Sequence, residues 1–363
     1  MRLSAQRALL ACLAVATGGC PCTTQNEVAS AARVPESPYP RTAQLSASDP
    51  LAVIGDVQRT SAWGRMVLAE SNLVEQRRLV DDLGKQDFRG VILLGDMVFS
   101  PGDDNWAYFD DLMAPLKSAP VAVSHSGLAP GGRSRYFFPV MGNHDYMGSR
   151  DLVTRQLNQR FPGFIEQTHY AFDWNHVRMI VLDGNRSRLC KNPEFGAHAC
   201  EAEWQAQLTW LSAELREVDR APAGEQYGAL LFVHQSPYTQ SPLVAGDQAD
   251  ARDFANELFA SERGLALISA HAHGFERYEY RRDTSDPRPA KVFVVSAGGG
   301  GPRPHWRRPG APPDLSNLAW PRPFNYLLLR QDKTAVHVDV RGLDKGQLVV
   351  QPLPGESVTL AFR

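Results

Sequence analysis

The feature that most constrains this chain is a short apolar run that occurs five times and each time leads into carboxylate, amide or imidazole side chains. Such runs are typical of buried strands, and the carboxyl ends of parallel strands meet at one edge of a sheet. An ordinary polar turn would account for one such strand end, but not for five of them in one chain. The residues concerned are Asp56, Asp96, Asn143, His234, His271 and His273. Together they predict a metal site at a sheet edge.

The spacing of these residues adds detail. Asp56 and Asp96 each follow an apolar run and a glycine, about one βα unit apart, so neighbouring parallel strands would bring both carboxylates to one edge. Gln58 points the same way as Asp56 if the backbone stays extended, which makes it a further candidate ligand. His271 and His273, two residues apart at a strand end, lie on one face and can each reach a different ion.

The donors in this set are oxygen and nitrogen without a thiolate, which suits Mn, Fe, Zn or Co. Six or seven ligands are too many for one catalytic ion with an open position, and they suit two ions that share one carboxylate. Such a pair polarises a phosphoryl oxygen and activates a water near neutral pH. His144 lies beside the ligands and is the predicted general acid, with Asp145 expected to fix the tautomer of its imidazole.

In this order the motifs resemble those of the calcineurin-like metallophosphoesterase superfamily: D-x-H, G-D, G-N-H-D/E, a lone H and G-H-x-H. Here they stand as Asp56-Val57-Gln58, Gly95-Asp96, Gly142-Asn143-His144-Asp145, His234 and Ala270-His271-Ala272-His273. The resemblance covers about residues 50–330. The segments 271–277 and 298–301 look like the purple acid phosphatase branch.

The resemblance implies an α/β fold, a two-sheet α/β/β/α sandwich with mixed sheets and a dimetal site at the sheet ends. It also implies that Asp96 bridges the two ions. Asn143, His234 and His271 would complete one site, and Asp56 and His273 the other.

The chain departs from the family pattern at three positions. Gln58 replaces the usual first histidine, although the ADP-ribose/CDP-alcohol diphosphatase branch also has glutamine there, so Gln58 can ligate through its amide oxygen. A neutral oxygen binds more weakly than imidazole, so the ion at this position is expected to be labile. Phe99 stands where purple acid phosphatases carry an iron-binding tyrosine, so no Fe(III)-tyrosinate is expected. Ala270 replaces a glycine, which matters only if a positive φ is needed there.

The N-terminus predicts export. Two arginines precede the apolar run 8–16, and small residues precede Cys20, so residues 1–19 resemble a secretory signal peptide of the bacterial lipoprotein type, with lipidation at Cys20. Residues 20–49 are rich in Ser, Ala, Pro and Thr and predict a flexible tether. The protein would be periplasmic or extracellular. A net charge of −2 indicates no nucleic-acid surface, so the only expected membrane contact is the lipid anchor.

The cysteines agree with an oxidising compartment. Cys190 and Cys200 are close in sequence and are predicted to form a disulfide, with two free thiols or a metal pair as alternatives. Cys12 would leave with the signal peptide. Cys22 has no assigned role.

Residues 50–363 are predicted to form one metallophosphoesterase domain, with the C-terminal strands in 325–363 completing the second sheet. A hairpin is expected over 169–183. The expected helices are 62–83, one ending near 116, 151–161, 201–218 and 251–259, and the expected C-terminal strands are 326–329, 335–340, 347–350 and 358–362.

The predicted function is an exported metal-dependent phosphoesterase that acts on small phosphate esters, foremost phosphomonoesters. The alternatives are a phosphodiesterase or nucleotide diphosphatase with the same site, and a non-catalytic binding lipoprotein with a degenerate site that holds at most one ion. The last rests on Gln58 and Phe99. Candidates for phosphate contacts in the flanking loops are Arg133, Arg135, Arg186, Arg188 and His198.

Overall fold

The structure is a computed structural model that describes residues 45–60, 70–116, 135–186, 197–222, 224–244 and 248–362. The predicted signal peptide, the lipidation site Cys20 and nearly all of the predicted tether lie outside these residues. So does Cys190, and the side chain of Cys200 is not described, which leaves the disulfide a prediction. No helix in the described part of the chain is both long and apolar enough to cross a membrane.

Two mixed sheets form the centre of the fold, as the sequence predicts. The seven-stranded sheet has the order β12-β11-β10-β1-β2-β3, with β13 paired to β11, and the six-stranded sheet has the order β4-β5-β6-β7-β9-β8. The first sheet consists of β1 (Leu51–Ile54), β2 (Gly90–Leu93), β3 (Tyr136–Pro139), β10 (Phe324–Gln331), β11 (Ala335–Leu343), β12 (Gln351–Pro352) and β13 (Val358–Ala361). The second consists of β4 (Tyr170–Trp174), β5 (Val177–Val181), β6 (Gly228–Val233), β7 (Gly264–Ser269), β8 (Phe275–Tyr280) and β9 (Lys291–Ser296).

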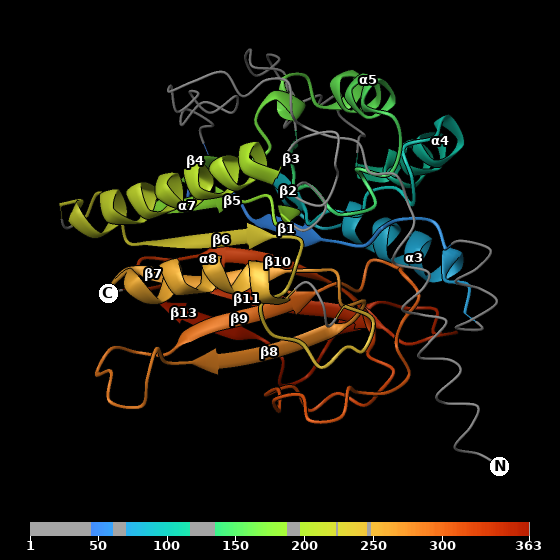
Figure 1. Cartoon of the computed structure of the whole chain (residues 1–363). Coiled ribbons are helices and arrows are strands. Elements are labelled where there is room, and N and C mark those ends of the chain that lie inside the picture. The colour runs from blue at the N-terminus through green and yellow to red at the C-terminus, as the bar shows by residue number, and fades with distance from the viewer. Residues whose placement is uncertain are drawn as a thin grey trace.

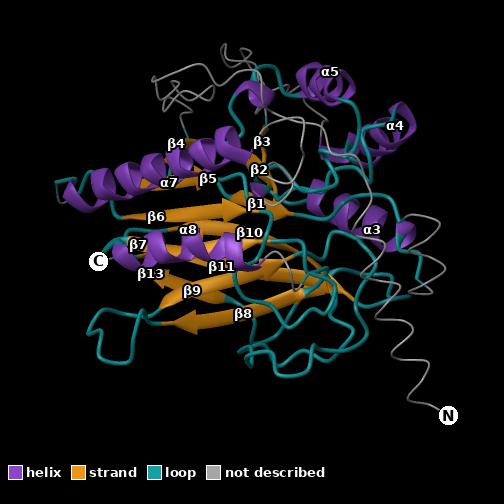
Figure 2. Cartoon of the chain, in the orientation of Figure 1, coloured by secondary structure: helices purple, strands orange, loops and turns teal. Residues whose placement is uncertain are grey.

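Helices lie against the outer faces of the sheets (Figures 1 and 2). The helix α3 (Leu73–Gly84) packs on β10 and β11, α7 (Ala197–Arg220) on β6, and α8 (Gln248–Ala260) on β7. The other helical elements are α4 (Asp103–Leu112), η1 (Ala114–Leu116), α5 (Arg150–Arg160) and η2 (Phe164–Glu166). Helix α5 begins after Ser149, whose hydroxyl accepts the N–H of Leu152 at 3.3 Å as an N-cap.

Parallel pairing brings the polar strand ends together. β1 pairs with β2 and β2 with β3 in parallel, and in the other sheet β5, β6, β7 and β9 pair in parallel. The strands β1, β2, β6 and β7 are buried along their whole length, which explains their continuous apolar runs. Their carboxyl ends therefore meet between the two sheets.

Some elements differ from the prediction. The strand expected over 347–350 is wrong: Leu348 and Val349 lie in a bend and are 74% and 70% exposed. The edge strand β8 is missed because charged residues interrupt its pattern. Of the helix expected over 62–83, residues 62–69 lie outside the described residues, and the rest is α3, which begins at Leu73. Glu70 and Asn72 precede α3 in non-helical backbone, where their buried side chains bind the loop after β9.

The C-terminal strands lie in the sheet that contains β1. β10 pairs with β1 in antiparallel fashion, with Leu329 opposite Leu51. The sequence predicts that these strands complete the second sheet, whereas the structure joins them to β1, β2 and β3. This pairing satisfies the backbone of β1, which would otherwise be a buried strand with an open edge.

Candidate metal centre

The backbone at the strand ends has an unusual conformation. Asp56, Asp96, His271 and His273 have φ angles of 55°, 51°, 69° and 54°, and Asn175 is the only other non-glycine residue with positive φ in the described chain. Positive φ costs free energy for a residue with a side chain and concentrates at functional sites. Ala270 has no positive φ, so the loss of the family's glycine there causes no strain of this kind.

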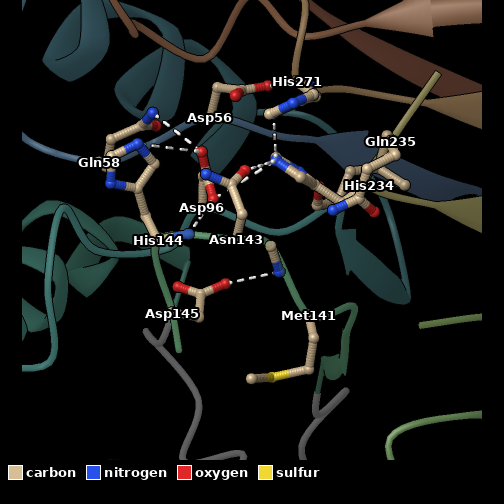
Figure 3. A network of polar contacts seen from close by, with 12 residues as sticks. Asp56, Gln58, Asp96, Met141, Asn143, His144, Asp145, His234, Gln235 and His271 are labelled. Carbon is tan, nitrogen blue, oxygen red and sulfur yellow. Dashed lines mark hydrogen bonds and ion pairs between the residues drawn. The ribbon is translucent and has the colours of Figure 1, made fainter. Parts of the chain in front are cut away.

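Two groups of potential ligands meet at these strand ends. In the first, donor atoms of Asp96, His234 and His271 lie within 4.8 Å of one another. Asn143 joins them, because its Oδ1 lies 3.2 Å from His234 Nε2, and His234 Nε2 lies 3.1 Å from His271 Nδ1. We call Asp96, Asn143, His234 and His271 the His234 cluster (Figure 3).

In the second group, donor atoms of Asp56, Asp96 and His273 lie within 4.8 Å of one another. His273 Nε2 lies 3.2 Å from Asp56 Oδ1, and Gln58 Nε2 lies 3.4 Å from His273 Nε2. We call Asp56, Gln58, Asp96 and His273 the His273 cluster. Asp96 belongs to both clusters and is fully buried between them.

Backbone carbonyls orient the imidazoles. Nδ1 of His234 lies 2.7 Å from the carbonyl oxygen of Leu94, and Nδ1 of His273 lies 2.7 Å from that of Pro302. A carbonyl oxygen only accepts, so Nδ1–H is the donor in each ring. In the neutral ring Nε2 then presents a lone pair to its cluster, which is the arrangement seen for metal-binding histidines.

A buried oxygen atom without a hydrogen-bond donor also fits a cation. Asp56 Oδ1 is buried, lies in the His273 cluster and has no hydrogen-bond partner. A buried, unpaired carboxylate oxygen is costly unless a positive charge lies beside it. Together with the oxygen and nitrogen donors of the two clusters, this shows that the residues present fit bound cations.

The carboxylates of the two clusters also favour protonation of the neighbouring histidines. Burial lowers the pKa of His234, but the carboxylates of Asp96 and Asp56 outweigh this and raise it to about 9. The pKa of His273 is also raised, because Asp56 outweighs the effect of burial. Protons and metal ions therefore compete for both clusters.

Gln58 lies in the predicted place, but its amide nitrogen is the atom that faces the cluster. Nε2 lies 3.2 Å from Asp96 Oδ2, while Oε1 is the buried atom without a partner. A half-turn of the amide exchanges the two atoms and directs Oε1 to the cluster, as ligation requires.

His144 lies at the accessible side of the centre, with 21% of its side chain exposed and Nε2 4.0 Å from Asp96 Oδ2. The structure corrects the prediction for Asp145. The carbonyl of Phe99, not Asp145, contacts His144 Nδ1, at 2.8 Å. The carboxylate of Asp145 points away (Figure 3) and accepts backbone N–H groups of Met97 at 2.9 Å, Val98 at 3.2 Å and Gly142 at 2.9 Å. It holds the loops after β2 and β3 together.

The arginines proposed for phosphate contacts have other partners. Arg135 donates to the carbonyls of Gly84 and Gln86, each at 3.1 Å. Arg186 pairs with Glu201 at 2.8 Å and with Asp253 at 3.2 Å. Arg133 and Arg188 lie outside the described residues, as does the side chain of His198.

One strand end beside the centre was missed in the sequence. β5 is followed by Asp183-Gly184-Asn185, and β5 is the parallel neighbour of β6, which leads into His234. The signal in the sequence is the same as at the other strand ends, an apolar run followed by an aspartate and a glycine. The segment is also the second arm of the expected hairpin, because β5 pairs with β4 in antiparallel fashion.

A two-sheet sandwich whose strand ends carry two sets of metal donors around a shared aspartate is the architecture of a dimetal phosphoesterase. The model of the calcineurin-like phosphoesterase family matches residues 50–275, more than half of the chain, and the chain belongs to this family. It is therefore a metallophosphoesterase of the hydrolase class, and the family implies a dinuclear metal site. A search of curated protein sequences gave no match.

Solved structures show the same fold at low identity. Purple acid phosphatase PPD1 from yellow lupin (Lupinus luteus) seeds is 16% identical with a TM-score of 0.52, over 90% of this chain and 55% of that chain. A dimetal phosphatase from Danio rerio is 15% identical with a TM-score of 0.55, over 87% of this chain and 99% of that chain. GAP50, the anchor in the inner membrane complex of Plasmodium, is 14% identical with a TM-score of 0.55, over 87% and 89%. This chain thus spans about half of the lupin protein.

Proposed function

We propose that this chain is an exported, metal-dependent phosphoesterase that hydrolyses small phosphate esters, foremost phosphomonoesters. The observation that carries the proposal is the position of Asp96, buried between two sets of donors from separate strand ends. A carboxylate in that position suits two cations of the kind used in two-metal hydrolysis.

The two clusters would each hold one transition-metal ion, such as Mn, Fe or Zn, with Asp96 shared. Asn143, His234 and His271 would complete one site, and Asp56, His273 and the amide oxygen of Gln58 the other. When bound, the two ions supply positive charge to the phosphoryl oxygens and acidify a water molecule. Phe99 offers no phenolate, so a tyrosinate-bound Fe(III) is not part of the proposal.

His144 would give a proton to the leaving oxygen. The carbonyl of Phe99 fixes its Nδ1–H, so Nε2 is the atom that carries the transferable proton. Asp145 would position His144 indirectly, because it binds the backbone of the loop that carries His144.

An assay of the purified chain tests the proposal. After chelator treatment, it should hydrolyse p-nitrophenyl phosphate, and more slowly bis(p-nitrophenyl) phosphate, once Mn, Zn or Fe is restored. Faster turnover of the bis-ester would favour the phosphodiesterase alternative, and a nucleotide diphosphate as best substrate would favour a diphosphatase. No metal-restored turnover on any phosphoester would contradict the proposal.

A second candidate is a non-catalytic binding protein that holds one ion. The observation in its favour is the amide nitrogen of Gln58, which faces the His273 cluster and would repel a cation. Metal analysis separates the two candidates, since two equivalents per chain favour the enzyme.

Export and lipid anchoring at Cys20 belong to the proposal through the sequence of residues 1–20. Mass spectrometry of the mature protein from a bacterial host tests them. The expected N-terminus is a lipid-modified Cys20. A mature protein that still contains residues 1–19 would contradict export by this signal.

A further inference from the structure

The side chain of Asn185 connects the two loops that carry Asn143 and His234. Its Nδ2 donates to the carbonyl of Met141 at 3.1 Å, and its Oδ1 accepts from Gln235 Nε2 at 2.8 Å. Met141 precedes the Gly142-Asn143-His144 turn, and Gln235 directly follows His234; Figure 3 labels both. Asn185 is 1% exposed, so water does not compete for these bonds.

These loops belong to different sheets. The turn with Asn143 follows β3, whereas His234 follows β6 and Asn185 follows β5. The distance of 3.2 Å between Asn143 Oδ1 and His234 Nε2 therefore depends on how the two sheets are held at this edge. Asn185 makes one of the bonds that join them.

Asp183 fixes the orientation of Asn185. Its Oδ1 accepts the side-chain amide of Asn185 at 2.7 Å and the backbone N–H of the same residue at 3.1 Å. Its Oδ2 accepts the hydroxyls of Thr168, at 2.7 Å, and of Tyr146. Tyr146 lies two residues after His144, so the network contacts the turn on both sides of Asn143 and His144.

We propose that Asn185, held by Asp183 and bonded to Gln235, is a positioning residue that sets Asn143 against His234 and so determines the affinity of the His234 cluster for its metal ion. The inference rests on the proposed role of that cluster. Groups that hydrogen-bond a metal ligand directly contribute roughly 10–100-fold to metal affinity, and Asn185 bonds the residues beside the ligands, so we expect an effect near the lower end of that range.

The test is titration of the full-length, metal-stripped chain with Mn²⁺ by calorimetry. Asn185→Ala should weaken the tighter of the two binding steps, which we assign to the His234 cluster, by roughly tenfold. Gln235→Leu removes only the bond between Gln235 and Asn185 and should have a smaller effect in the same direction, because the bond from Asn185 to the carbonyl of Met141 remains. The double variant should lose little more than Asn185→Ala alone, because Asn185→Ala already removes the bond to Gln235.

Gln156→Ala is the matched control. Gln156 is also a buried amide, but its partners are Asp103 and Arg160, at helices α4 and α5. This variant should lower Tm and leave both Mn²⁺ affinities unchanged. If Asn185→Ala does not fold, Gln235→Leu carries the test.

The outcomes separate this inference from the proposed function. If Asn185→Ala binds Mn²⁺ more weakly but the wild-type chain hydrolyses no phosphoester, the proposed function is wrong and the positioning role of Asn185 stands. Folded Asn185 and Gln235 variants with unchanged Mn²⁺ affinity overturn the positioning role alone. A wild-type chain that binds no Mn²⁺ overturns both.

Discussion

The two halves of the metal centre share Asp96 but differ in their other donors. The His234 cluster adds two imidazoles and an amide oxygen, and His234 itself is fully buried. The His273 cluster adds one imidazole, a second carboxylate and an amide whose nitrogen faces inward, and the side chain of His273 is 12% exposed. A neutral amide oxygen binds a transition-metal ion more weakly than an imidazole nitrogen does.

Two clusters that both contain their predicted ligand residues can therefore differ in their affinity for metal ions. Every predicted ligand residue lies at the centre, but Gln58 turns its amide nitrogen toward the His273 cluster, and only the His234 cluster has two imidazoles. We expect one tightly bound ion and one that exchanges.

The largest expected effect is that of Asp96→Asn, because Asp96 serves both clusters. Loss of the shared charge should abolish binding of both ions and lower kcat/KM by roughly 10³-fold or more, since bound cations stabilise transition-state charge by several kcal/mol. Metal content by elemental analysis and turnover on p-nitrophenyl phosphate measure it. Asp339→Asn, on the far strand β11, is the control. Loss of only one ion would show that the two clusters do not share this residue.

His144→Ala should leave both clusters loaded and slow the reaction. Removal of a general acid costs roughly 10²–10⁴-fold in rate. The loss should be smaller for p-nitrophenyl phosphate than for an alkyl phosphate, since p-nitrophenolate leaves without a proton. Equal losses on both substrates would contradict the assignment of His144 as the acid.

Gln58→His should reduce the difference in metal affinity between the His234 cluster and the His273 cluster. An imidazole in place of the amide should tighten the weaker Mn²⁺ or Zn²⁺ by roughly tenfold or more and leave the tighter ion unchanged. Calorimetric titration measures both steps. Weaker binding in the variant would mean that the amide oxygen already serves as a good ligand.

The smallest expected effect is on the pH dependence of the metal-stripped chain. The pKa of His234 is about 9 against an ordinary value of 6.5, because the carboxylates outweigh burial. A raised pKa stabilises the folded state fully below 6.5, and this contribution is lost as the pH rises to 9. Tm of the stripped chain should therefore fall relative to His234→Gln across that window, while Mn²⁺ affinity rises. If Tm of the stripped wild-type chain and Tm of His234→Gln changed in parallel with pH, this prediction would be wrong.

The fold and the ligand residues of the two clusters could be predicted from the sequence, because both depend on local residue patterns and on the order of the motifs along the chain. Continuous apolar runs predict buried parallel strands, and the polar residue after each must lie at their common edge. The order of the motifs then identified the family, which the family match confirms.

What the sequence could not supply depends on contacts between distant residues. Asp145 is adjacent to His144 in the chain, but the turn directs its carboxylate to the backbone of Met97 and leaves the imidazole to the carbonyl of Phe99. A carbonyl has no signature in a sequence. The role of Asn185 was hidden for the same reason, since its partners follow other strands.

The most direct test is a crystal structure of the Mn²⁺-loaded chain with phosphate bound, with the anomalous scattering of manganese used to locate the ions. We predict two peaks, roughly 4 Å apart, with the carboxylate of Asp96 between them and the weaker peak beside Gln58 and His273. A single peak, or two peaks that Asp96 does not contact, would contradict it.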